Sequence, residues 1–563
     1  MKKLQFNTLI ITIAIVFTTS FQGILYGQSN QDDAAIALKA EEYIKKIQKD
    51  WKIPGLSVSI SKGGKVVYAK GFGVKELTNN MFSDGKNMVD EDTVFQIGSI
   101  SKSFTATVMA QLVDEGKIKW EDTVKNILPD FRMYDKWVEE NLQVRDIMTH
   151  HTGIGGQAGT YIPNLGYGRE DVYKMLPFFK PTYGFRGGYE YNNITFIIAS
   201  KIIEKLTGKS WEDNIRERIL IPLGMTSTSI NKEGFNASKN VAVPHEFYYS
   251  KGRMLTDSTW TDSLVVNPLY GDEQALHWLT VIGPAGGINS TAVDMAKYAQ
   301  FHLDLGRVGD KQIISRKQMQ YLHKGQTITS QDSSRTTLYG HCWFVEQNSR
   351  YRLYFHTGTT WGFTAICAFV PEQNLSIVML ANSEVPSSPR YALMRRVIDY
   401  YKGFPEKDYS ASYLASFMKE ERDSERVKSE KLKSEELKVK SGEVNSEELK
   451  VNSEELKVNS EKLKVKSDKL KSEELAGVYD KGEPFGKAVV TMEGDDLYIT
   501  IGTEGWKHKI KRLPGDKFSF RSDGHGFDLK FVLKESRRGK VKVCGMDIDF
   551  GYDENFGIWK KIK

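Results

Sequence analysis

Residues 95–113 read FQIGSISKSFTATVMAQLV, a stretch with a serine and a lysine three positions apart at the expected start of a helix. Apolar residues then recur with a helical period that ends near Gly116, at Phe104, Val108, Leu112 and Val113. Residues i and i+3 of a helix share a face, so the Lys102 amine can reach the Ser99 hydroxyl. A serine becomes a strong nucleophile when a base takes its proton. We therefore predict that Ser99 is a nucleophile at the N-terminus of an amphipathic helix and that Lys102 is a base whose pKa burial lowers.

The tetrapeptide Ser-Ile-Ser-Lys occurs a second time, at residues 59–62. This copy lies in an alternating apolar and polar run before Gly63-Gly64, which predicts a strand and a turn. Side chains three positions apart on a strand point to opposite faces, so a lysine cannot activate a serine there. We predict that this copy is structural. For the copy at residues 99–102, the alternative is a serine that only caps a helix.

Tyr191-Asn192-Asn193 is a second candidate motif, placed just before an apolar helical run. A phenol there can relay a proton between nucleophile and leaving group, and the amide of Asn193 can hold both lysine and substrate. The alternative is an aromatic core residue followed by a helix cap.

His-Thr-Gly also occurs twice. The copy at 151–153 follows a short helical run and predicts a helix end and a loop. The copy at 356–358 ends an alternating run, where Gly358 would let a substrate lie along the strand. The backbone N–H of Thr359 would then complete an oxyanion hole with that of Ser99. With a reference pKa of about 6.5, His356 is expected to bind a substrate carboxylate more tightly as pH falls; the alternative is that it only packs the strand.

The chain divides by composition into four parts. Residues 1–27 are expected to be a signal peptide, with an uncleaved anchor as the alternative. Residues 28–402 mix helices with hairpins at both ends, which predicts one antiparallel sheet closed by the two ends of this part, an α/β (α+β) sandwich. Residues 403–472 form a charged linker in which SEELKVN occurs twice in tandem, with spacing unsuited to a coiled coil. Residues 473–563 read as a small all-β domain without a catalytic constellation.

Several functions are excluded by composition. The net charge of +6 is spread over 563 residues, so we expect no nucleic-acid partner. The histidines lack ligand spacing and the Gly71–Gly73 segment lacks the rest of a nucleotide site, so we expect no metal and no cofactor. The three cysteines are far apart in the sequence and form no metal or redox motif. Whether Cys342 and Cys367 form a disulfide is not decided by the sequence. After signal removal we expect no stable membrane insertion and no partner protein, only a small-molecule or peptide substrate.

Residues 40 to about 400 resemble the class C β-lactamase and D-alanyl-D-alanine carboxypeptidase superfamily; β-lactamases and penicillin-binding proteins carry a Ser-x-x-Lys motif and a Lys-Thr-Gly strand. The resemblance rests on the three motifs in order and on three further stretches: Phe95-Gln96-Ile97-Gly98-Ser99, Asp146-Ile147-Met148-Thr149-His150 and Gly283-Pro284-Ala285-Gly286-Gly287. It implies an acyl-enzyme mechanism with Ser99 as nucleophile and Lys102 and Tyr191 as the base pair. The substrate would contact Asn193, His356, Thr357, Gly358 and Thr359.

One departure from the family bears on the substrate. His356 stands where class C β-lactamases carry lysine. A histidine at this position resembles the peptidases and esterases of the superfamily. We therefore expect an exported, periplasmic or secreted hydrolase of D-amino-acid peptides or related small substrates. Hydrolysis of β-lactams or small esters is the alternative, and a penicillin-binding sensor without turnover is an alternative of another class.

Overall fold

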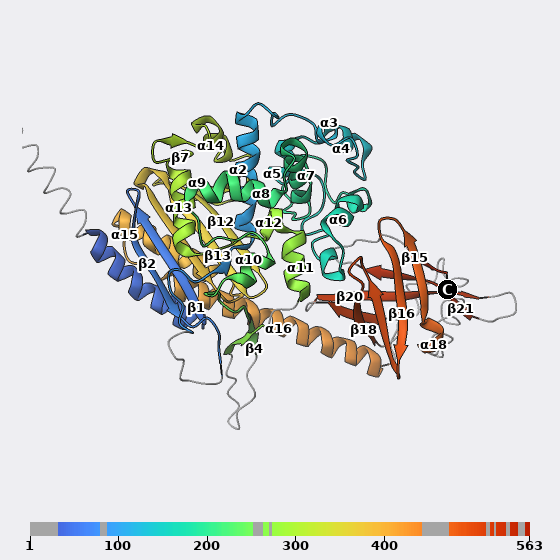
Figure 1. Cartoon of the computed structure of the whole chain (residues 1–563). Coiled ribbons are helices and arrows are strands. Elements are labelled where there is room, and N and C mark those ends of the chain that lie inside the picture. Colours follow the sequence, from blue (N-terminus) through green and yellow to red (C-terminus); the bar gives the residue numbers. More distant parts are fainter. Residues whose placement is uncertain are drawn as a thin grey trace, which may run out of the picture.

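The computed structural model describes residues 32–78, 87–250, 263–269, 273–441, 472–513, 518–522, 525–535, 541–549 and 558–562. The predicted signal peptide lies outside the described residues, as do positions 442–471 of the charged linker. The chain forms a mixed α/β part followed by a long helix and a β-barrel (Figure 1).

An eight-stranded antiparallel sheet is the centre of the α/β part, in the order β2-β1-β14-β13-β12-β11-β10-β9. Its strands are β1 (Gly55–Lys62), β2 (Lys65–Gly73), β9 (Thr327–Gln331), β10 (Arg335–Tyr339), β11 (Phe344–Asn348), β12 (Arg352–Thr360), β13 (Phe363–Val370) and β14 (Leu375–Ala381). Leu56 of the first strand pairs with Ala381 of the last. The predicted closure of one antiparallel sheet by strands from both ends of this part is confirmed.

Helices cover both faces of this sheet. Residues 32–50 are helical and pack with α15 (Ser388–Lys402) on one face, where Val58 and Ile60 are buried. Helix α13 (Ala292–Leu303) contacts β1 and β14 from the other face. The helices α3 (Val124–Ile127), α4 (Lys136–Asn141), α5 (Val144–Met148), α6 (Arg169–Met175) and α7 (Thr195–Thr207) form a lobe away from β1 and β2 (Figure 1). The other helices of this part are α8 (Trp211–Ile215), α9 (Ile221–Leu223), α10 (Lys232–Ala237), α11 (Glu273–Val281), α12 (Gly283–Gly286) and α14 (Arg316–Leu322).

Helix α2 (Ser101–Asp114) differs from its prediction. The apolar period predicts an amphipathic helix, but every residue from Ser101 to Leu112 is buried. The cause is its position: α7, α12 and α14 all contact it, so no face remains for solvent. Ser99 precedes α2 in the short turn η1 (Gly98–Ile100).

Short elements connect these units. The 3-10 turns are η2 (Ile162–Leu165), η3 (Leu176–Phe178) and η5 (Pro371–Gln373), and η4 (Arg216–Leu220) is a π-helical turn. Two-stranded pairs are formed by β3 (Phe95–Gln96) with β6 (Asn289–Ser290), β4 (His245–Ser250) with β5 (Ser263–Pro268), and β7 (Arg307–Val308) with β8 (Lys311–Gln312).

Helix α16 (Tyr409–Ser441) begins beyond residue 402, where the sequence predicts the linker. Its first turns pack on the α/β part: the Trp51 indole donates to Ser410 Oγ at 3.2 Å, and the Trp51 and Phe417 rings lie 5.7 Å apart. The domain boundary at residue 402 remains a prediction. Residues beyond it, Ser410 and Phe417, still contact Trp51 of the α/β part. None of the helices in the described ranges has both the length and the apolar character required to cross a membrane.

The C-terminal part is all-β, as predicted, and closes into an eight-stranded barrel after the short helix α18 (Ser472–Leu475). Its strands are β15 (Gly477–Gly482), β16 (Gly486–Glu493), β17 (Asp496–Ile501), β18 (Trp506–Arg512), β19 (Phe518–Ser522), β20 (His525–Glu535), β21 (Val541–Asp549) and β22 (Trp559–Lys561). The barrel contacts the helical lobe through hydrogen bonds from Tyr167 Oη to the Phe485 carbonyl (2.8 Å) and from the Glu504 N–H to the Gly166 carbonyl (3.0 Å).

Candidate active site

Ser99 and Lys102 meet at the start of the buried helix. Ser99 lies in η1 on the wall of a cavity, and Lys102 is in the first turn of α2. Lys102 Nζ is 3.2 Å from Ser99 Oγ, 2.6 Å from Asn193 Oδ1 and 3.1 Å from the Ala285 carbonyl. The i, i+3 spacing therefore brings the two groups within hydrogen-bonding distance, as the motif predicts.

The surroundings of Lys102 disfavour its charged form. Its side chain is fully buried, and all three hydrogen-bond partners are uncharged. Nζ lies 4.5 Å from the centre of the Tyr191 ring and 5.3 Å from that of Phe196. Burial lowers the pKa of Lys102 from 10.5 to about 7. Near neutral pH, a substantial fraction of this lysine is thus the free amine that can accept a proton.

Tyr191 lies beside this pair. Its hydroxyl is buried and makes no hydrogen bond of good geometry with the described residues. Burial raises the pKa of the phenol well above its usual value, while the neighbouring Ser99 hydroxyl acts in the opposite direction. Tyr191 is therefore a neutral phenol that can donate or relay a proton at the candidate nucleophile.

His150 supports the Tyr191 ring, a role that sequence reasoning missed. The ring centroids lie 4.5 Å apart, and His150 Nδ1 accepts from the Asn192 N–H at 3.2 Å. Burial, and then the nearby Lys102, hold the pKa of His150 well below 6.5. His150 ends the 146–150 stretch that supports the family resemblance, but its contacts with Tyr191 and Tyr339 come from segments distant in the chain, so its role could not be predicted from that stretch.

The Asn193 amide is oriented by partners on both sides. Its Oδ1 accepts from Lys102, and its Nδ2 donates to Gln157 Oε1 at 3.1 Å and Thr160 Oγ1 at 3.4 Å. The carbonyl must therefore point towards the lysine. Gln157 and Thr160 also line the cavity, but they belong to a loop without a recognisable pattern and were not predicted.

Two glycines let the strand β12 approach the turn η1. A methyl group added at Gly358 would lie 1.9 Å from the Ile97 carbonyl oxygen and 3.0 Å from the Ser99 backbone nitrogen. One added at Gly98, where φ is +51°, would lie 2.8 Å from the Thr359 nitrogen. The nitrogens of Ser99 and Thr359 are therefore close together beside the Ser99 side chain. This is the arrangement in which two N–H groups can bind a developing oxyanion.

Arg390 anchors this part of β12 from the opposite side. It is fully buried in α15 and donates to the carbonyls of Gly358 and Ala365, the latter at 3.0 Å. Arg390 was not predicted, because the sequence offers no sign that a helix beginning near residue 388 covers β12.

His356 lies on β12 and lines the cavity, as the sequence predicts, but its ring is held by neighbouring groups. Its Nδ1 is 2.7 Å from the Thr357 carbonyl and its Nε2 is 3.1 Å from the Tyr339 hydroxyl. A carbonyl can only accept, so the proton is on Nδ1, and Nε2 accepts from Tyr339. Burial lowers the pKa of His356 to about 3. At this pKa the ring is neutral between pH 5.5 and 8, so the structure does not support the expectation that carboxylate binding tightens as His356 titrates in this range.

The duplicate motifs lie outside this site. Ser59 is on β1 and donates to the Ala292 carbonyl at 2.8 Å, while Lys62 bonds to the Gln373 carbonyl. His151 follows α5 and contacts Thr149 and Thr327. The structure confirms that the Ser-Ile-Ser-Lys copy at 59–62 lies on a strand and that the His-Thr-Gly copy at 151–153 lies in a loop.

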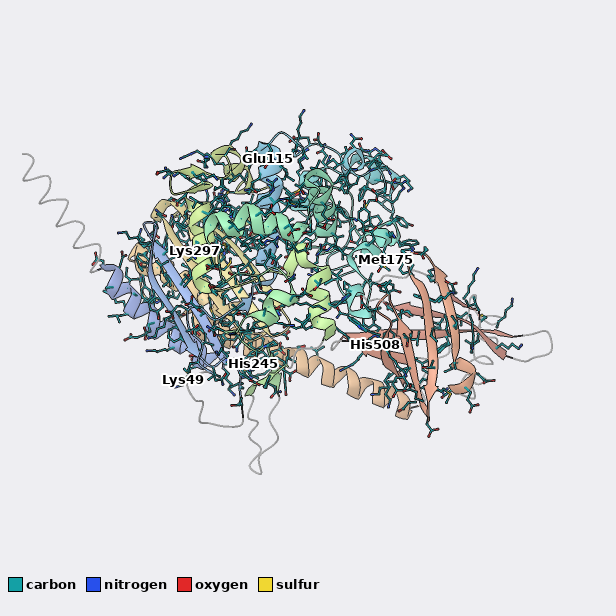
Figure 2. The ribbon with its side chains drawn as sticks, in the orientation of Figure 1. Lys49, Glu115, Met175, His245, Lys297 and His508 are labelled. Atoms are coloured by element: carbon teal, nitrogen blue, oxygen red, sulfur yellow. The ribbon has the colours of Figure 1, made fainter. Side chains whose placement is uncertain are left out.

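Cys342 and Cys367 are buried free thiols, and Cys544 is partly buried and also free. The structure therefore has no disulfide between Cys342 and Cys367. The described residues hold no group of three or more His, Cys, Asp or Glu suited to a metal ion. His245, at the start of β4, and His508, in β18 of the barrel, lie in different parts of the chain (Figure 2).

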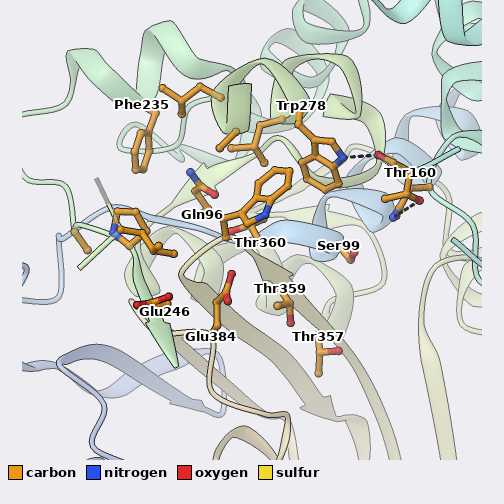
Figure 3. A pocket seen from close by; sticks show the side chains of 18 of the residues that line it. Gln96, Ser99, Thr160, Phe235, Glu246, Trp278, Thr357, Thr359, Thr360 and Glu384 are labelled. Carbon is orange, nitrogen blue, oxygen red and sulfur yellow. Dashed lines mark hydrogen bonds between the residues drawn. The ribbon is translucent and has the colours of Figure 1, made fainter. Parts of the chain in front are cut away.

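A cavity of about 1090 Å³ lies over Ser99 (Figure 3). Its wall includes the predicted residues Tyr191, Asn193, His356, Thr357 and Thr359. Trp278 and Trp361 meet edge to face at 4.6 Å, and the Trp278 indole donates to the Thr160 carbonyl at 2.6 Å. This aromatic wall was not predicted, because nothing in the sequence indicates that the helix holding Trp278 packs against the end of β12.

The antiparallel sheet, the buried helix and the Ser-Lys pair define the β-lactamase and penicillin-binding class of serine hydrolases. A family model described as beta-lactamase matches residues 40–401, and the chain belongs to this family.

Curated relatives include unguisins hydrolase ungD' of Aspergillus campestris, 29% identical over 64% of this chain and 64% of that protein. Penicillin-binding protein 4 of Amycolatopsis lactamdurans is 26% identical over 64% of this chain and 90% of its own length. Protein flp of Staphylococcus aureus is 26% identical over 62% of this chain and 66% of its own. The chain thus spans about two thirds of the length of the fungal and staphylococcal relatives.

Among solved structures, the octameric penicillin-binding protein homologue from Pyrococcus abyssi aligns with a TM-score of 0.49 and 23% identity. The alignment covers 91% of this chain and 98% of that one.

Proposed function

We propose that the protein is an exported serine hydrolase that cleaves amide or ester bonds through an acyl-enzyme on Ser99. The observation that carries the proposal is the fully buried Lys102, which has only uncharged partners and lies 3.2 Å from the Ser99 hydroxyl. A lysine in such a place is costly for folding, and its lowered pKa suits a general base at neutral pH.

The chemistry follows from the neighbouring groups. Neutral Lys102 takes the proton of Ser99 as Oγ attacks the substrate carbonyl, and the N–H groups of Ser99 and Thr359 bind the oxyanion. Tyr191 relays the proton taken up by Lys102 to the leaving group as the carbonyl re-forms and the bond to the leaving group breaks, which leaves an ester on Ser99 and a neutral Lys102. Water then attacks this ester with the proton transfers reversed, and Ser99 is regenerated.

For the substrate we propose D-amino-acid peptides or related small amides and esters, without a partner protein. Hydrolysis of β-lactams and binding of penicillin without turnover are the competing functions. Support for turnover comes from the complete set of Ser99, Tyr191 and Asn193 on one cavity wall and Lys102 hydrogen-bonded behind them. Export is supported by the charged and apolar N-terminus, and N-terminal sequencing of the secreted protein would test it.

Active-site labelling tests the mechanism. Mass spectrometry after treatment with a fluorophosphonate or a penicillin should find one adduct, on Ser99. Ser99→Ala should abolish labelling and hydrolysis, while Ser59→Ala, in the duplicate motif, should leave both nearly unchanged. Robust labelling of Ser99→Ala would contradict the proposal. A stable penicillin adduct together with no turnover of any ester or amide would favour the sensor.

A further inference from the structure

The charged groups on the cavity wall all have one sign. Of the described lining residues, Glu246 in β4 and Glu384, three positions after β14, carry charge, whereas the only imidazole, His356, is neutral. Figure 3 shows both carboxylates on the same side of the cavity, beyond Thr359 as seen from Ser99. Among the described residues, the cavity wall thus presents negative charge to a substrate and no cation to a substrate carboxylate.

Neither carboxylate is neutralised by a base within the described parts of the chain. Glu384 Oε1 accepts from the Gly362 N–H at 2.8 Å, and Glu246 Oε1 accepts from the Asn267 amide at 2.8 Å. Both donors are uncharged. Burial raises the pKa of Glu384, and the charge of Glu246 raises it further, so the two groups are close enough to repel each other. A positive charge between them would relieve this repulsion.

Thr360 gives an independent indication of a ligand. Its side chain is 6% exposed and lines the same cavity, yet its hydroxyl makes no hydrogen bond to the described residues. A buried hydroxyl without a partner is costly unless a ligand or water satisfies it. The aromatic rings of Trp278 and Trp361 line the cavity as well, and such rings attract cations.

We propose that this side of the cavity binds a positively charged group of the substrate, such as an amine, and that Glu246 and Glu384 determine this specificity. The inference rests on the proposed function, because it concerns substrates that acylate Ser99. It narrows them to small amides and esters that carry an amine, and it disfavours those that carry a carboxylate near the reacting bond.

Matched substrates test the proposal. On the leaving-group side, a thiocholine ester is compared with its uncharged isostere, the 3,3-dimethylbutyl thioester. On the acyl side, D-alanine p-nitroanilide is compared with its neutral N-acetyl and anionic N-succinyl derivatives. In at least one placement, the cationic compound should have a kcat/KM roughly tenfold or more above that of the neutral one, as expected for one desolvated ion pair. The succinyl compound should be the poorest substrate.

The variants isolate the two carboxylates. Glu246→Gln with Glu384→Gln removes both charges but keeps the side-chain oxygens that accept from Asn267 and Gly362. The ratio of kcat/KM for the cationic compound to kcat/KM for the neutral one should then fall towards one, while turnover of the neutral ester persists. Glu372→Gln is the matched control, since this exposed glutamate lies in η5, at the far end of the β13–β14 hairpin. Raising the salt concentration should reduce the preference of the wild type and leave that of the double variant unchanged.

The proposal is overturned if the wild type shows no preference for the cation in either placement, or if the double variant retains it. Failure of the proposed function has a different signature: neutral esters would not turn over, or would turn over equally in Ser99→Ala. In that case calorimetry with choline and 3,3-dimethylbutanol makes the same comparison without turnover. Equal affinity for the two would then overturn the proposal.

Discussion

Lys102 and His356 are both fully buried near Ser99, and burial acts on both in the same direction. It lowers the pKa of the lysine to about 7, into the range where a base is useful. It lowers that of the imidazole to about 3, where the ring no longer titrates under ordinary conditions. The same physical effect therefore makes one residue a candidate catalyst and the other a neutral hydrogen-bonding group.

The pKa of Lys102 predicts a pH profile. Only the free amine accepts the Ser99 proton, so kcat/KM for a neutral ester should rise with pH up to about 7 and level off above it. Below that pH the rate should fall about tenfold per unit. Lys102→Met should lower kcat/KM by about 10²- to 10⁴-fold, whereas Lys62→Met, in the duplicate motif, should have little effect. A rate that stays constant down to pH 5.5 would contradict this role.

Between elements, the contact of β12 with η1 determines the reaction geometry. Gly358 and Gly98 allow the two backbones to touch, and Arg390 of α15 holds β12 from the other side. Three segments far apart in the chain thus place the Thr359 N–H beside Ser99. A shift of any one of them would move an oxyanion donor rather than a side chain.

Gly358→Ala tests this contact. An alanine Cβ cannot lie 1.9 Å from the Ile97 carbonyl, so β12 must move away from η1. We expect kcat/KM to fall by about 10²- to 10³-fold, the usual effect of losing one oxyanion donor, together with a lower unfolding temperature. Gly184→Ala is the control, because a methyl group there meets no atom within 4 Å. Equal activities of Gly358→Ala and wild type would show that the backbone contact is not required.

Across the whole molecule, buried histidines link stability to pH. Burial lowers the pKa of His323, His341 and His356 to about 3 and holds those of His150 and His302 well below 6.5. The unfolded chain takes up these protons near pH 6.5 and the folded chain does not. As pH falls from 7 towards 4, the unfolded state therefore binds more protons, and the free energy of unfolding falls.

Thermal unfolding between pH 8 and 5 measures this linkage. The unfolding temperature should fall steadily as pH falls below about 7, with each histidine contributing up to about 1.4 kcal/mol per pH unit. Above pH 7 the lowered pKa of Lys102 adds a slope in the same direction. His341→Phe should reduce the slope, because a phenyl ring can replace the imidazole between Trp120 and Tyr321 without titrating. An unfolding temperature that does not change down to pH 5 would contradict the neutral state of these rings.

The sequence by itself determined the features that depend on near neighbours in the chain. Helical spacing brings Ser99 to Lys102, alternation places Ser59 on a strand, and the turn residues mark the β13–β14 hairpin. The all-β character of the C-terminal part followed from short alternating runs. These conclusions need only local periodicity and turn chemistry, which a few consecutive residues specify.

Only the tertiary structure decided the charges and the walls of the site. The neutral state of His356 depends on its burial and on Tyr339 from another strand, and the full burial of α2 depends on three other helices. Glu384, Arg390 and Trp278 reach the site from segments that no local pattern connects to Ser99. Desolvation depends on everything packed around a group, so the same side chain is a base, a neutral ring or a charge according to neighbours that are distant in the chain.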